Sequence, residues 1–406
     1  MKIDAHGAPS QIDFGDKNLY AQGDPTAAWA ELRRDRPVHW NTRLDGTGFW
    51  AVTRYRDAVH VLKDFRAFTS EPGMRLDHNP AATEAAAGKL LIVTDGARHT
   101  EIRKVINTAF TPRMVARLKE NMRAIARAEI DAAVGGVCDF TEVAAVLPVS
   151  VICDMLGIPR SDWKDMLGYT RVAFGDSATD SMQRLEAHAR ILEYYQDIVD
   201  FRREHPGDDV ITAMVNGTVD GVPLSDEEIF LNCDGLISGG NETTRQATVG
   251  GLLALMANPD QWQIASRCPE DIAVLVEEVL RYTSPALHVL RTPREDVEVG
   301  GQKIKANEPV TVWLPSANRD EAVFQDPDRF DVTRSPNAHL AFGIGSHYCL
   351  GASLARSELQ VFFTEMLSTV SAAETVGPVR RLASNLIWGF ESVPVLLHEA
   401  KQSAVR

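Results

Sequence analysis

The segment 342–352 constrains the fold more than any other part of the chain, because it holds a single cysteine among three glycines and runs directly into helix-forming residues. Cys349 is therefore expected on a loop that opens a helix. At such a place the unpaired helical amides and the helix dipole stabilise a thiolate, and glycines let backbone N–H groups approach the sulfur. A thiolate held in this way is a metal ligand or a nucleophile.

Zinc and iron–sulfur sites are disfavoured for Cys349, since no second cysteine lies within ten residues on either side. A single thiolate whose far side is open suits the proximal ligand of a haem iron. A buried structural cysteine in a glycine-rich turn is the remaining alternative. The pattern F-G-x-G-x-H-x-C-x-G over residues 342–351 resembles the haem-binding signature of the cytochrome P450 family at every fixed position.

This resemblance implies a mostly helical α+β fold for residues 1–406, a triangular helical domain with small β-sheets that encloses a buried haem b. Cys349 would ligate the iron, and Phe342, His347 and Gly351 would contact the haem. The implied reaction is activation of O₂ with electrons that come ultimately from NAD(P)H through redox partners.

A long helix is predicted from the capping box at residues 225–228 to the Asn258-Pro259 breaker. Gly239 and Gly240 lie in its middle, where each costs roughly 1 kcal/mol relative to alanine. A tight helix crossing or a simple kink would explain them in structural terms. A functional explanation is that they remove side chains where a ligand needs room.

The same stretch resembles the oxygen-activating motif [AG]-G-x-[DE]-T of the P450 family. The resemblance implies that the glycines, Gly239 among them, make room for the haem and dioxygen. It also implies that Glu242 and Thr243 organise water and relay protons.

His99 and Arg103 are four residues apart in a predicted helix and so share one helix face. Spacing alone favours two solvated surface residues. The P450 family commonly has a histidine and an arginine at this spacing, where both bind haem propionates, so the resemblance implies that role here. By the same resemblance, Arg291 and His347 complete the propionate-binding set.

Glu278 and Arg281 are three residues apart on another predicted helix. As a surface pair they would contribute only about 0.2–0.5 kcal/mol. In the P450 family the E-x-x-R pattern is a buried ion pair that supports the cysteine loop from behind. The resemblance therefore implies a structural role for both residues, not a catalytic one.

Four residues are expected to contact the substrate. Leu287, His288 and Val289 match the wall of the family's substrate pocket, and Ile387 lies at the tip of a predicted hairpin. Segment 70–90 shows no steady period and is expected to be a long loop that lines the cavity. This mixture of side chains suggests a moderately sized organic molecule with some polar or aromatic character.

A basic run lies between residues 97 and 125, in a chain whose net charge is −14. Its bases are Arg98, Arg103, Lys104, Arg113, Arg117, Lys119 and Arg123. Such a run is usually a solvated helix face. The resemblance places it beside the thiolate side of the haem, where it would steer an acidic electron carrier such as a ferredoxin.

Composition excludes several other classes. The negative net charge argues against nucleic acid as a partner, and the longest apolar run, residues 143–153, is too short to span a membrane. The five cysteines are odd in number and widely spaced, which fits a reducing compartment. We expect a cytoplasmic monomer that contacts neither membrane nor nucleic acid.

The favoured interpretation is a monooxygenase of secondary-metabolite biosynthesis, and hydroxylation of a small organic substrate is its favoured reaction. A non-catalytic haem sensor or a peroxide-driven enzyme could keep the cysteine loop, but neither needs Glu242 and Thr243 in a glycine-opened helix. Oxidative C–C or C–N bond formation uses the same oxidant, and the motifs do not distinguish it from hydroxylation.

Overall fold

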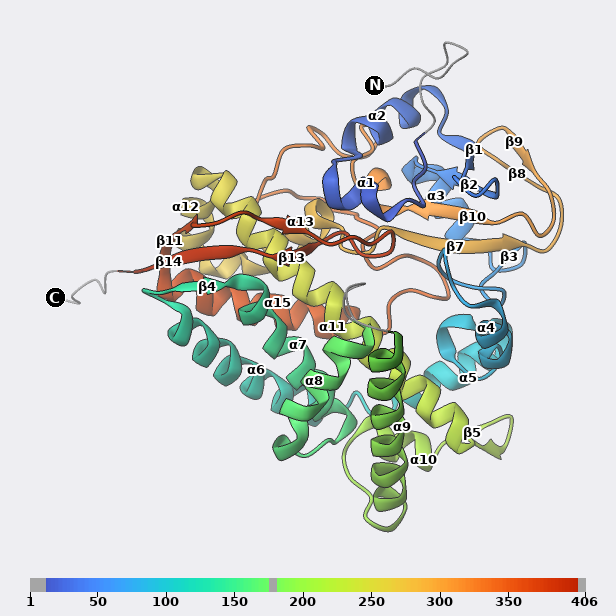
Figure 1. The fold of residues 1–406 in the computed structure, drawn as a ribbon, viewed down its shortest axis with the longest axis horizontal. Coiled ribbons are helices and arrows are strands. Elements are labelled where there is room, and N and C mark those ends of the chain that lie inside the picture. The colour runs from blue at the N-terminus through green and yellow to red at the C-terminus, as the bar shows by residue number, and fades with distance from the viewer. Residues whose placement is uncertain (1–11, 175–180, 401–406) are drawn as a thin grey trace.

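The computed structural model describes residues 12–174 and 181–400, and most of this chain is helical (Figure 1). The first helices are α1 (Lys17–Gln22), α2 (Thr26–Asp35), α3 (Tyr55–Lys63), α4 (Pro80–Ala86), α5 (Gly96–Asn107), α6 (Pro112–Ala133), α7 (Phe140–Leu156) and α8 (Trp163–Phe174). The later helices are α9 (Ser181–Glu204), α10 (Val210–Val215), α11 (Asp226–Ala257), α12 (Pro259–Arg267), α13 (Ile272–Thr283), α14 (Leu314–Ala317) and α15 (Ala352–Thr369). Short 3₁₀ turns occur at Leu91–Val93, Arg160–Asp162 and Pro269–Asp271. The predicted class, mostly helical with small sheets, is confirmed.

The strands form small sheets, of which the largest described one has the order β1-β2-β10-β7-β3 and a smaller one the order β11-β14-β4. The strands up to β7 are β1 (Val38–Thr42), β2 (Gly48–Val52), β3 (Phe68–Thr69), β4 (Val137–Asp139), β5 (Thr218–Val219), β6 (Val222–Pro223) and β7 (His288–Pro293). The others are β8 (Val297–Val299), β9 (Gln302–Ile304), β10 (Val310–Trp313), β11 (Val370–Thr375), β12 (Arg380–Arg381), β13 (Phe390–Ser392) and β14 (Pro394–Glu399). In the larger sheet β10 runs parallel to β2 and antiparallel to β7.

Helix α11 runs through the middle of the helical part and packs against α7, α13 and α15 (Figure 1). Its 32 residues span about 48 Å. The predicted capping box is formed, because the backbone N–H of Ser225 donates to Glu228 Oε2 at 2.8 Å and that of Glu228 donates to Ser225 Oγ at 3.3 Å. Both predicted ends of this helix agree with the structure.

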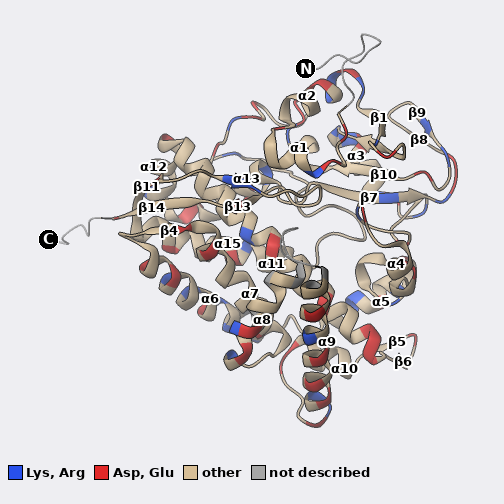
Figure 2. Cartoon of the chain, in the orientation of Figure 1, with Lys and Arg blue, Asp and Glu red and all other residues tan. Residues whose placement is uncertain are grey.

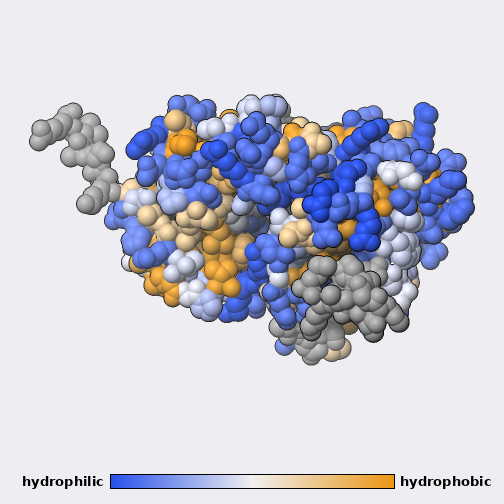
Figure 3. Space-filling model, turned by 90° about the horizontal axis from the view of Figure 1, so that it is seen from above, coloured by the Kyte–Doolittle hydropathy of each residue, from blue (hydrophilic) through white to orange (hydrophobic). Residues whose placement is uncertain are grey.

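Buried apolar side chains form one large cluster among the helices and two smaller clusters around the sheet near the N-terminus. Charged residues are prominent on helices such as α6 and α9 (Figure 2), and the face seen from above is largely hydrophilic with scattered apolar residues (Figure 3). Within residues 12–174 and 181–400, no helix has both the length and the apolar character that crossing a membrane requires.

The prediction of a continuous loop at 70–90 is wrong, because α4 lies inside that segment. The Asn79 side chain accepts a hydrogen bond from the Ala82 N–H at 3.1 Å, and Pro80 occupies the first turn. An N-cap followed by proline is a typical helix start. The alanine-rich sequence after it has no apolar period, which concealed the helix.

The ion pair of Glu278 and Arg281 is buried completely in α13, as the resemblance implied. Arg281 donates to both carboxylate oxygens of Glu278 at 2.8 Å, and its remaining donors reach the carbonyl oxygens of Asn318 and Pro327. Glu278 also accepts from Arg334 at 3.1 Å. The pair therefore ties α13 to the irregular segment that leads to the cysteine loop.

Candidate active site

The cysteine loop closes on itself directly before α15. The Cys349 N–H donates to the Phe342 carbonyl at 3.0 Å, and the Cys349 carbonyl accepts from the Ala352 N–H at 3.3 Å. Gly345 has φ +87°, and a Cβ there would lie 2.5 Å from the Leu62 carbonyl oxygen. Only glycine fits at this position, so the loop is held against the end of α3.

The thiol of Cys349 is accessible from solvent, yet the protein around it displaces enough water to raise its pKa above the ordinary range. A hydrogen bond from the Gly351 N–H and the charges of Arg103 and Arg356 act in the opposite direction. The sequence predicted that the helix amides would stabilise a thiolate, but these groups do not outweigh desolvation in the protein alone. A coordinated cation would supply the missing charge, because coordination deprotonates a thiol.

The four residues predicted to bind propionates come together from α5, β7 and the cysteine loop. Burial, together with the charges of His347 and Arg103, lowers the pKa of His99 to about 4. His99 is only 3% exposed, its ring centroid lies 4.3 Å from that of His347, and its Nε2 atom has no hydrogen-bond partner among the described residues. At neutral pH His99 is therefore an uncharged group with one unsatisfied nitrogen.

Two arginines near this histidine carry positive charges that no described carboxylate pairs with. Arg291 is buried, which lowers its pKa to about 10, and its Nη1 donates to the Leu290 carbonyl at 2.8 Å. Burial likewise lowers the pKa of Arg103. Asp95 is engaged by His347 and Arg294, and across the described ranges no carboxylate forms an ion pair with Arg103 or Arg291. The charge of Asp95 acts on Arg291, but neither desolvated cation has an ion-pair partner of its own, which favours binding of an anionic group.

Asp95 is a residue of this site that the sequence analysis missed. Its Oδ1 accepts from His347 Nε2 at 2.7 Å, and its Oδ2 accepts from Thr69 Oγ1 at 2.5 Å and from the Ser70 N–H at 2.8 Å. These hydrogen bonds hold the pKa of Asp95 well below its usual range against the opposing effect of burial. Asp95 directly precedes α5 but makes no capping bond there, so an N-cap pattern would have assigned it the wrong role.

The two adjacent glycines of α11 serve different purposes. A Cβ at Gly240 would lie 2.6 Å from Ile152 Cδ1, so this glycine permits the close crossing of α7 and α11. A Cβ at Gly239 would meet nothing within 4 Å among the described residues. The helix-crossing explanation therefore holds for Gly240, while Gly239 borders open space.

Thr243 and Glu242 follow in the next turn. The Thr243 hydroxyl donates to the Gly239 carbonyl at 2.9 Å. Glu242 is held by Arg245 at 3.1 Å and by Gln246 at 2.6 Å. The alcohol is thus placed beside the open space at Gly239, and the acid is anchored by two neighbours on its own helix.

Two of the four predicted substrate contacts, Leu287 and His288, are buried in the structure. Leu287 is fully buried within an apolar cluster. His288 is buried as well, with Nε2 accepting from the Leu76 N–H at 2.9 Å and Nδ1 donating to the Asn385 carbonyl at 2.9 Å. Neither ring nitrogen is left for a ligand, so both residues support the wall from behind.

Val289 and Ile387 differ from these two because each keeps part of its side chain accessible. The hairpin that carries Ile387 is joined to the start of β7 through the Leu287 N–H, which donates to the Leu386 carbonyl at 2.8 Å, and through a bridge between Ala286 and Ile387. The contact of Val289 and Ile387 with substrate stays a prediction.

The comparisons with known proteins agree with one another. A family model described as cytochrome P450 matches residues 272–384. Cytochrome P450 NovI of Streptomyces niveus is 37% identical over 390 residues, which cover 95% of this chain and 96% of that protein. Linalool 8-monooxygenase of Pseudomonas putida is 35% identical over 399 residues, covering 95% and 98%. The chain belongs to the cytochrome P450 family.

The fold of this P450 is also that of solved members. The crystal structure of P450 OxyD, described as involved in the biosynthesis of vancomycin-type antibiotics, superposes with a TM-score of 0.88 at 34% identity, covering 96% of this chain and 100% of that one. The protein is accordingly a haem-dependent monooxygenase that receives NAD(P)H-derived electrons through partner proteins.

The residues present fit a haem. The unsatisfied Nε2 of His99 and the uncompensated charges of Arg103 and Arg291 suit propionate carboxylates. The space beside Gly239 and the accessible thiol of Cys349 suit the two faces of the ring. His347 has its Nε2 occupied by Asp95, which leaves Nδ1 for the haem. Phe342, stacked 4.6 Å from the Arg356 guanidinium, and Gly351, at the start of α15, stay predicted contacts.

The basic run of residues 97–125 does not form one open patch in the P450. Ion pairs join Arg98 to Glu228, Lys104 to Glu101, Arg117 to Asp154 and Arg123 to Glu365. Arg103 is close enough to Cys349 for their charges to interact. Arg113 and Lys119 are exposed and form no ion pair among the described residues, so part of the run keeps free positive charge and its role in docking stays a prediction.

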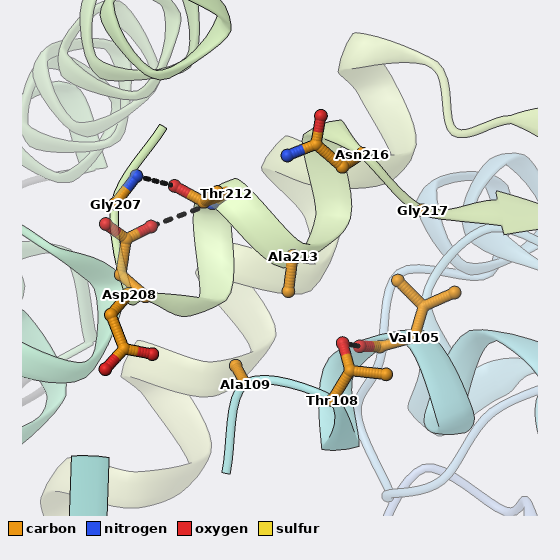
Figure 4. A pocket seen from close by; sticks show the side chains of 10 residues that line it. Val105, Thr108, Ala109, Gly207, Asp208, Thr212, Ala213, Asn216 and Gly217 are labelled. Carbon is orange, nitrogen blue, oxygen red and sulfur yellow. Dashed lines mark hydrogen bonds between the residues drawn. The ribbon is translucent and has the colours of Figure 1, made fainter. Parts of the chain in front are cut away.

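A pocket of about 360 Å³ lies between the end of α5 and α10, away from the residues assigned above (Figure 4). Two of its polar side chains, of Thr108 and Thr212, bond to backbone groups of the pocket, with Thr108 Oγ1 donating to the Val105 carbonyl at 2.7 Å and the Gly207 N–H donating to Thr212 Oγ1 at 2.9 Å. These two hydroxyls therefore have hydrogen-bond partners without a ligand in the pocket.

Proposed function

We propose that this P450 hydroxylates a small organic molecule in secondary metabolism, using haem b and electrons from a ferredoxin-type protein. The observation that carries the proposal is the position of Thr243, whose hydroxyl lies one turn from Gly239 at the open side of α11. A non-catalytic haem protein has no need for an alcohol there.

When bound, the haem supplies the binding of O₂ and its reductive activation. Thr243 donates its hydrogen to the Gly239 carbonyl, so its oxygen remains an acceptor toward the open space. A hydroxyl in this position holds a water molecule and passes protons without changing its own charge. Glu242, which is partly exposed and held by Arg245 and Gln246, is the acid nearest in the chain to resupply those protons.

The substrate would lie against Val289 and Ile387, whose accessible apolar surfaces favour a largely apolar organic molecule over a sugar or a nucleotide. Two relatives support an organic substrate and a role in secondary metabolism, since one is named linalool 8-monooxygenase and OxyD is described as involved in the biosynthesis of vancomycin-type antibiotics.

The electron donor would dock outside the cysteine loop. A Cβ at Gly345 would lie 3.2 Å from Lys63 Cα, which places the end of α3 against the loop. The residues there present exposed positive and aromatic side chains, namely Lys63, Phe65 at 52% exposure, and Arg66. Such a surface complements an acidic iron–sulfur protein and would steer its approach.

Haem b and a cytoplasmic location are further parts of the proposal. The sequence contains no Cys-x-x-Cys-His pattern for covalent attachment of haem. All five cysteines, Cys349 included, are free thiols, which suits a reducing compartment.

The deciding experiment compares Thr243→Ala with Thr243→Ser in the purified enzyme with a bound substrate. We expect the alanine variant to keep the reduced carbon monoxide spectrum typical of thiolate ligation but to consume NAD(P)H without forming product. The serine variant, which restores the hydroxyl, should recover coupling. Unchanged coupling in the alanine variant would remove Thr243 from the proposed role.

Product analysis with isotopically heavy O₂ separates the reaction types. Incorporation of label into product supports hydroxylation, whereas loss of hydrogen without label would favour bond formation between carbon and carbon or nitrogen. Full activity with peroxide and none with a reduced ferredoxin would instead support a peroxide-driven enzyme.

A further inference from the structure

Gln246 connects α11 to the hairpin formed by β12 and β13. The residue is buried, with only 1% of its surface exposed. Its Oε1 accepts from the Phe390 N–H at 2.7 Å, and its Nε2 donates to the Phe390 carbonyl at 3.0 Å. The side-chain amide therefore pairs with both backbone groups of one residue, as a neighbouring antiparallel strand would.

The same amide also holds Glu242, which lies one turn earlier in α11. The Nε2 atom of Gln246 donates to Glu242 Oε1 at 2.6 Å. The amide offers two N–H groups and one oxygen, and it meets two acceptors and one donor. Only one orientation of the amide satisfies all three contacts, because the reverse would place its NH₂ group against the Phe390 N–H and its oxygen against the carboxylate.

The hairpin that Gln246 holds also carries Ile387, a predicted substrate contact. The stretch around Ile387 is attached to the segment before β7, since the Trp388 N–H donates to the Pro285 carbonyl at 2.8 Å. Its other attachment is the pairing of Phe390 with Gln246. The hairpin is thus fixed to α11 through the same side chain that holds Glu242.

The hairpin and the amide fit closely at Gly389. This glycine is buried, and a Cβ there would overlap Oε1 and Cδ of Gln246. The amide therefore cannot keep its place when the hairpin moves toward it. Because hydrogen bonds weaken as they bend, a turned amide would also lose its bond to Glu242 or redirect the carboxylate.

Arg245 holds the other side of the Glu242 carboxylate. Its Nη1 lies 3.1 Å from Glu242 Oε2, and its Nε donates to the Thr141 carbonyl at the start of α7 at 3.1 Å. This ion pair compensates the charge of Glu242, so the bond from Gln246 serves to direct the carboxylate. The Glu242 side chain is 19% exposed, which leaves it within reach of water.

We propose that Gln246 is a positioning residue that links the substrate hairpin to the proton supply, so that the direction of the Glu242 carboxylate depends on where the hairpin lies. The inference rests on the roles proposed above for Glu242 and Ile387. A substrate that presses on Ile387 and shifts the hairpin would, through Phe390 and Gln246, redirect the carboxylate that supplies protons. Proton delivery would then depend on whether the substrate site is occupied.

The test compares Gln246→Leu, Glu242→Gln and the double variant in the haem-loaded enzyme. Leucine has a similar size to glutamine but no polar side-chain atoms. The matched control is Gln261→Leu, because Gln261 in α12 is also buried, accepts from the Val332 N–H at 2.9 Å and donates to Asp260 at 2.9 Å. The reduced carbon monoxide spectrum of each variant checks that thiolate ligation is intact.

Gly389→Ala is a second variant, which carries the same test if Gln246→Leu does not fold. Its Cβ displaces the Gln246 amide without removing any polar atom from the protein. Both variants should therefore disturb the same contact by different means.

Two quantities are measured. Hydrogen–deuterium exchange at the Phe390 N–H, followed by mass spectrometry of the peptides that contain it, reports on the hairpin without turnover. The second is the rate of NAD(P)H oxidation in light and in heavy water, at saturating reduced ferredoxin and with no organic substrate added. It reports on proton delivery, because O₂ is released as hydrogen peroxide or water only after it takes up protons.

We expect Gln246→Leu and Gly389→Ala to speed exchange at Phe390 and to slow NAD(P)H oxidation severalfold, with a changed solvent isotope effect. Glu242→Gln should slow oxidation about tenfold or more and leave exchange at Phe390 unaltered. The double variant should be no slower than Glu242→Gln, because Gln246 acts through Glu242. Gln261→Leu should match the unaltered enzyme in both quantities.

The outcomes separate failure of this inference from failure of the proposed function. Additive slowing in the double variant, equal rates in Gln246→Leu and Gln261→Leu, or unchanged exchange at Phe390 in Gln246→Leu would overturn the inference alone. If Glu242→Gln itself changes neither the rate nor the isotope effect, the proposed proton supply is wrong and the inference is overturned with it.

Discussion

His347 Nε2 donates to Asp95 Oδ1 at 2.7 Å, which joins the cysteine loop to the residue that precedes α5. The His347 ring also lies 4.3 Å from that of His99, so a single carboxylate orients one of the two imidazoles that are predicted to bind the haem propionates. The Asp95 side chain is only 7% exposed, and its carboxylate also accepts hydrogen bonds from Thr69 and Ser70. It is a positioning residue and does not itself touch the reacting atoms.

Replacing Asp95 with asparagine should destabilise the protein and loosen the haem. The pKa of Asp95 is depressed in the folded state, so its contribution is fully present above the unfolded value near 3.9 and is lost as pH falls through the folded value. At neutral pH we expect a loss of about 1–3 kcal/mol in the free energy of unfolding. Urea unfolding and the rate of haem transfer to apomyoglobin measure the two effects.

The exposed Asp131→Asn is the control for this variant, since Asp131 pairs with Arg127 on the surface of α6. It should change neither quantity measurably. If Asp95→Asn matches this control at pH 7, Asp95 does not position His347.

The two glycines of α11 should respond in opposite ways to alanine. Gly240→Ala places a Cβ 2.6 Å from Ile152 Cδ1 and should destabilise the protein by about 1–3 kcal/mol. Gly239→Ala meets no described atom within 4 Å and should gain up to about 1 kcal/mol of helix propensity. It would nonetheless lower turnover, because the methyl group enters the space next to Thr243. Thermal unfolding and product formation distinguish the two variants.

A double variant tests the cause of the Gly240 effect. Ile152→Val removes the Cδ1 atom that the new methyl group would meet. Combining it with Gly240→Ala should therefore cost less than the sum of the single changes. Strict additivity would show that the α7–α11 crossing is not the constraint at Gly240.

Charge reversal at Lys63 and Arg66 should weaken the interaction with the electron donor. Both side chains are exposed at the end of α3 that contacts the cysteine loop. We expect slower reduction of the double Glu variant by a reduced ferredoxin, measured by stopped flow, and a smaller dependence on salt. The control is Arg190→Glu on α9, on another side of the molecule (Figure 1). Equal rates for both variants would place the docking surface elsewhere.

Local sequence patterns were sufficient for those parts of the site that lie within one element. The capping box of α11 depends on neighbouring residues, so it was visible in the sequence, whereas the need for glycine at 345 comes from the distant Leu62. The Glu278–Arg281 pair is likewise formed within one helix, although its burial was implied only by the resemblance.

Roles that depend on distant elements were not visible. Asp95 meets His347, which is 252 residues away, and no local pattern reports that distance. Both ring nitrogens of His288 are hydrogen-bonded to backbone groups of Leu76 and Asn385, from two other segments, which the match to the family's pocket wall did not report. Some ion-pair partners of the basic run, such as Glu365, likewise come from other helices, so the sequence did not show which of its charges are paired.

Stability should fall on mild acidification because buried histidines stay neutral. Burial lowers the pKa of His288 to about 4. Between pH 6.5 and 4 the unfolded chain binds a proton that the folded protein excludes, so the free energy of unfolding decreases as pH falls, by up to about 1.4 kcal/mol per pH unit. His288→Gln should reduce this slope while lowering stability at pH 7. Urea midpoints across the range test this, and an unaltered slope would contradict it.

The buried pair of Glu278 and Arg281 gives the largest expected loss of stability. Glu278→Gln removes the negative charge that faces Arg281 and Arg334, and both guanidinium groups would then lie in the interior without compensation. Breaking such a pair typically costs about 3–5 kcal/mol. The substitution should also disturb the position of Cys349, because the same hydrogen-bond network holds the segment before the cysteine loop. We therefore expect the variant to lose haem and, in reduced carbon monoxide spectra, to show a larger fraction without thiolate ligation. A variant that unfolds earlier but keeps an intact thiolate spectrum until it unfolds would show that the pair stabilises α13 without supporting the cysteine loop.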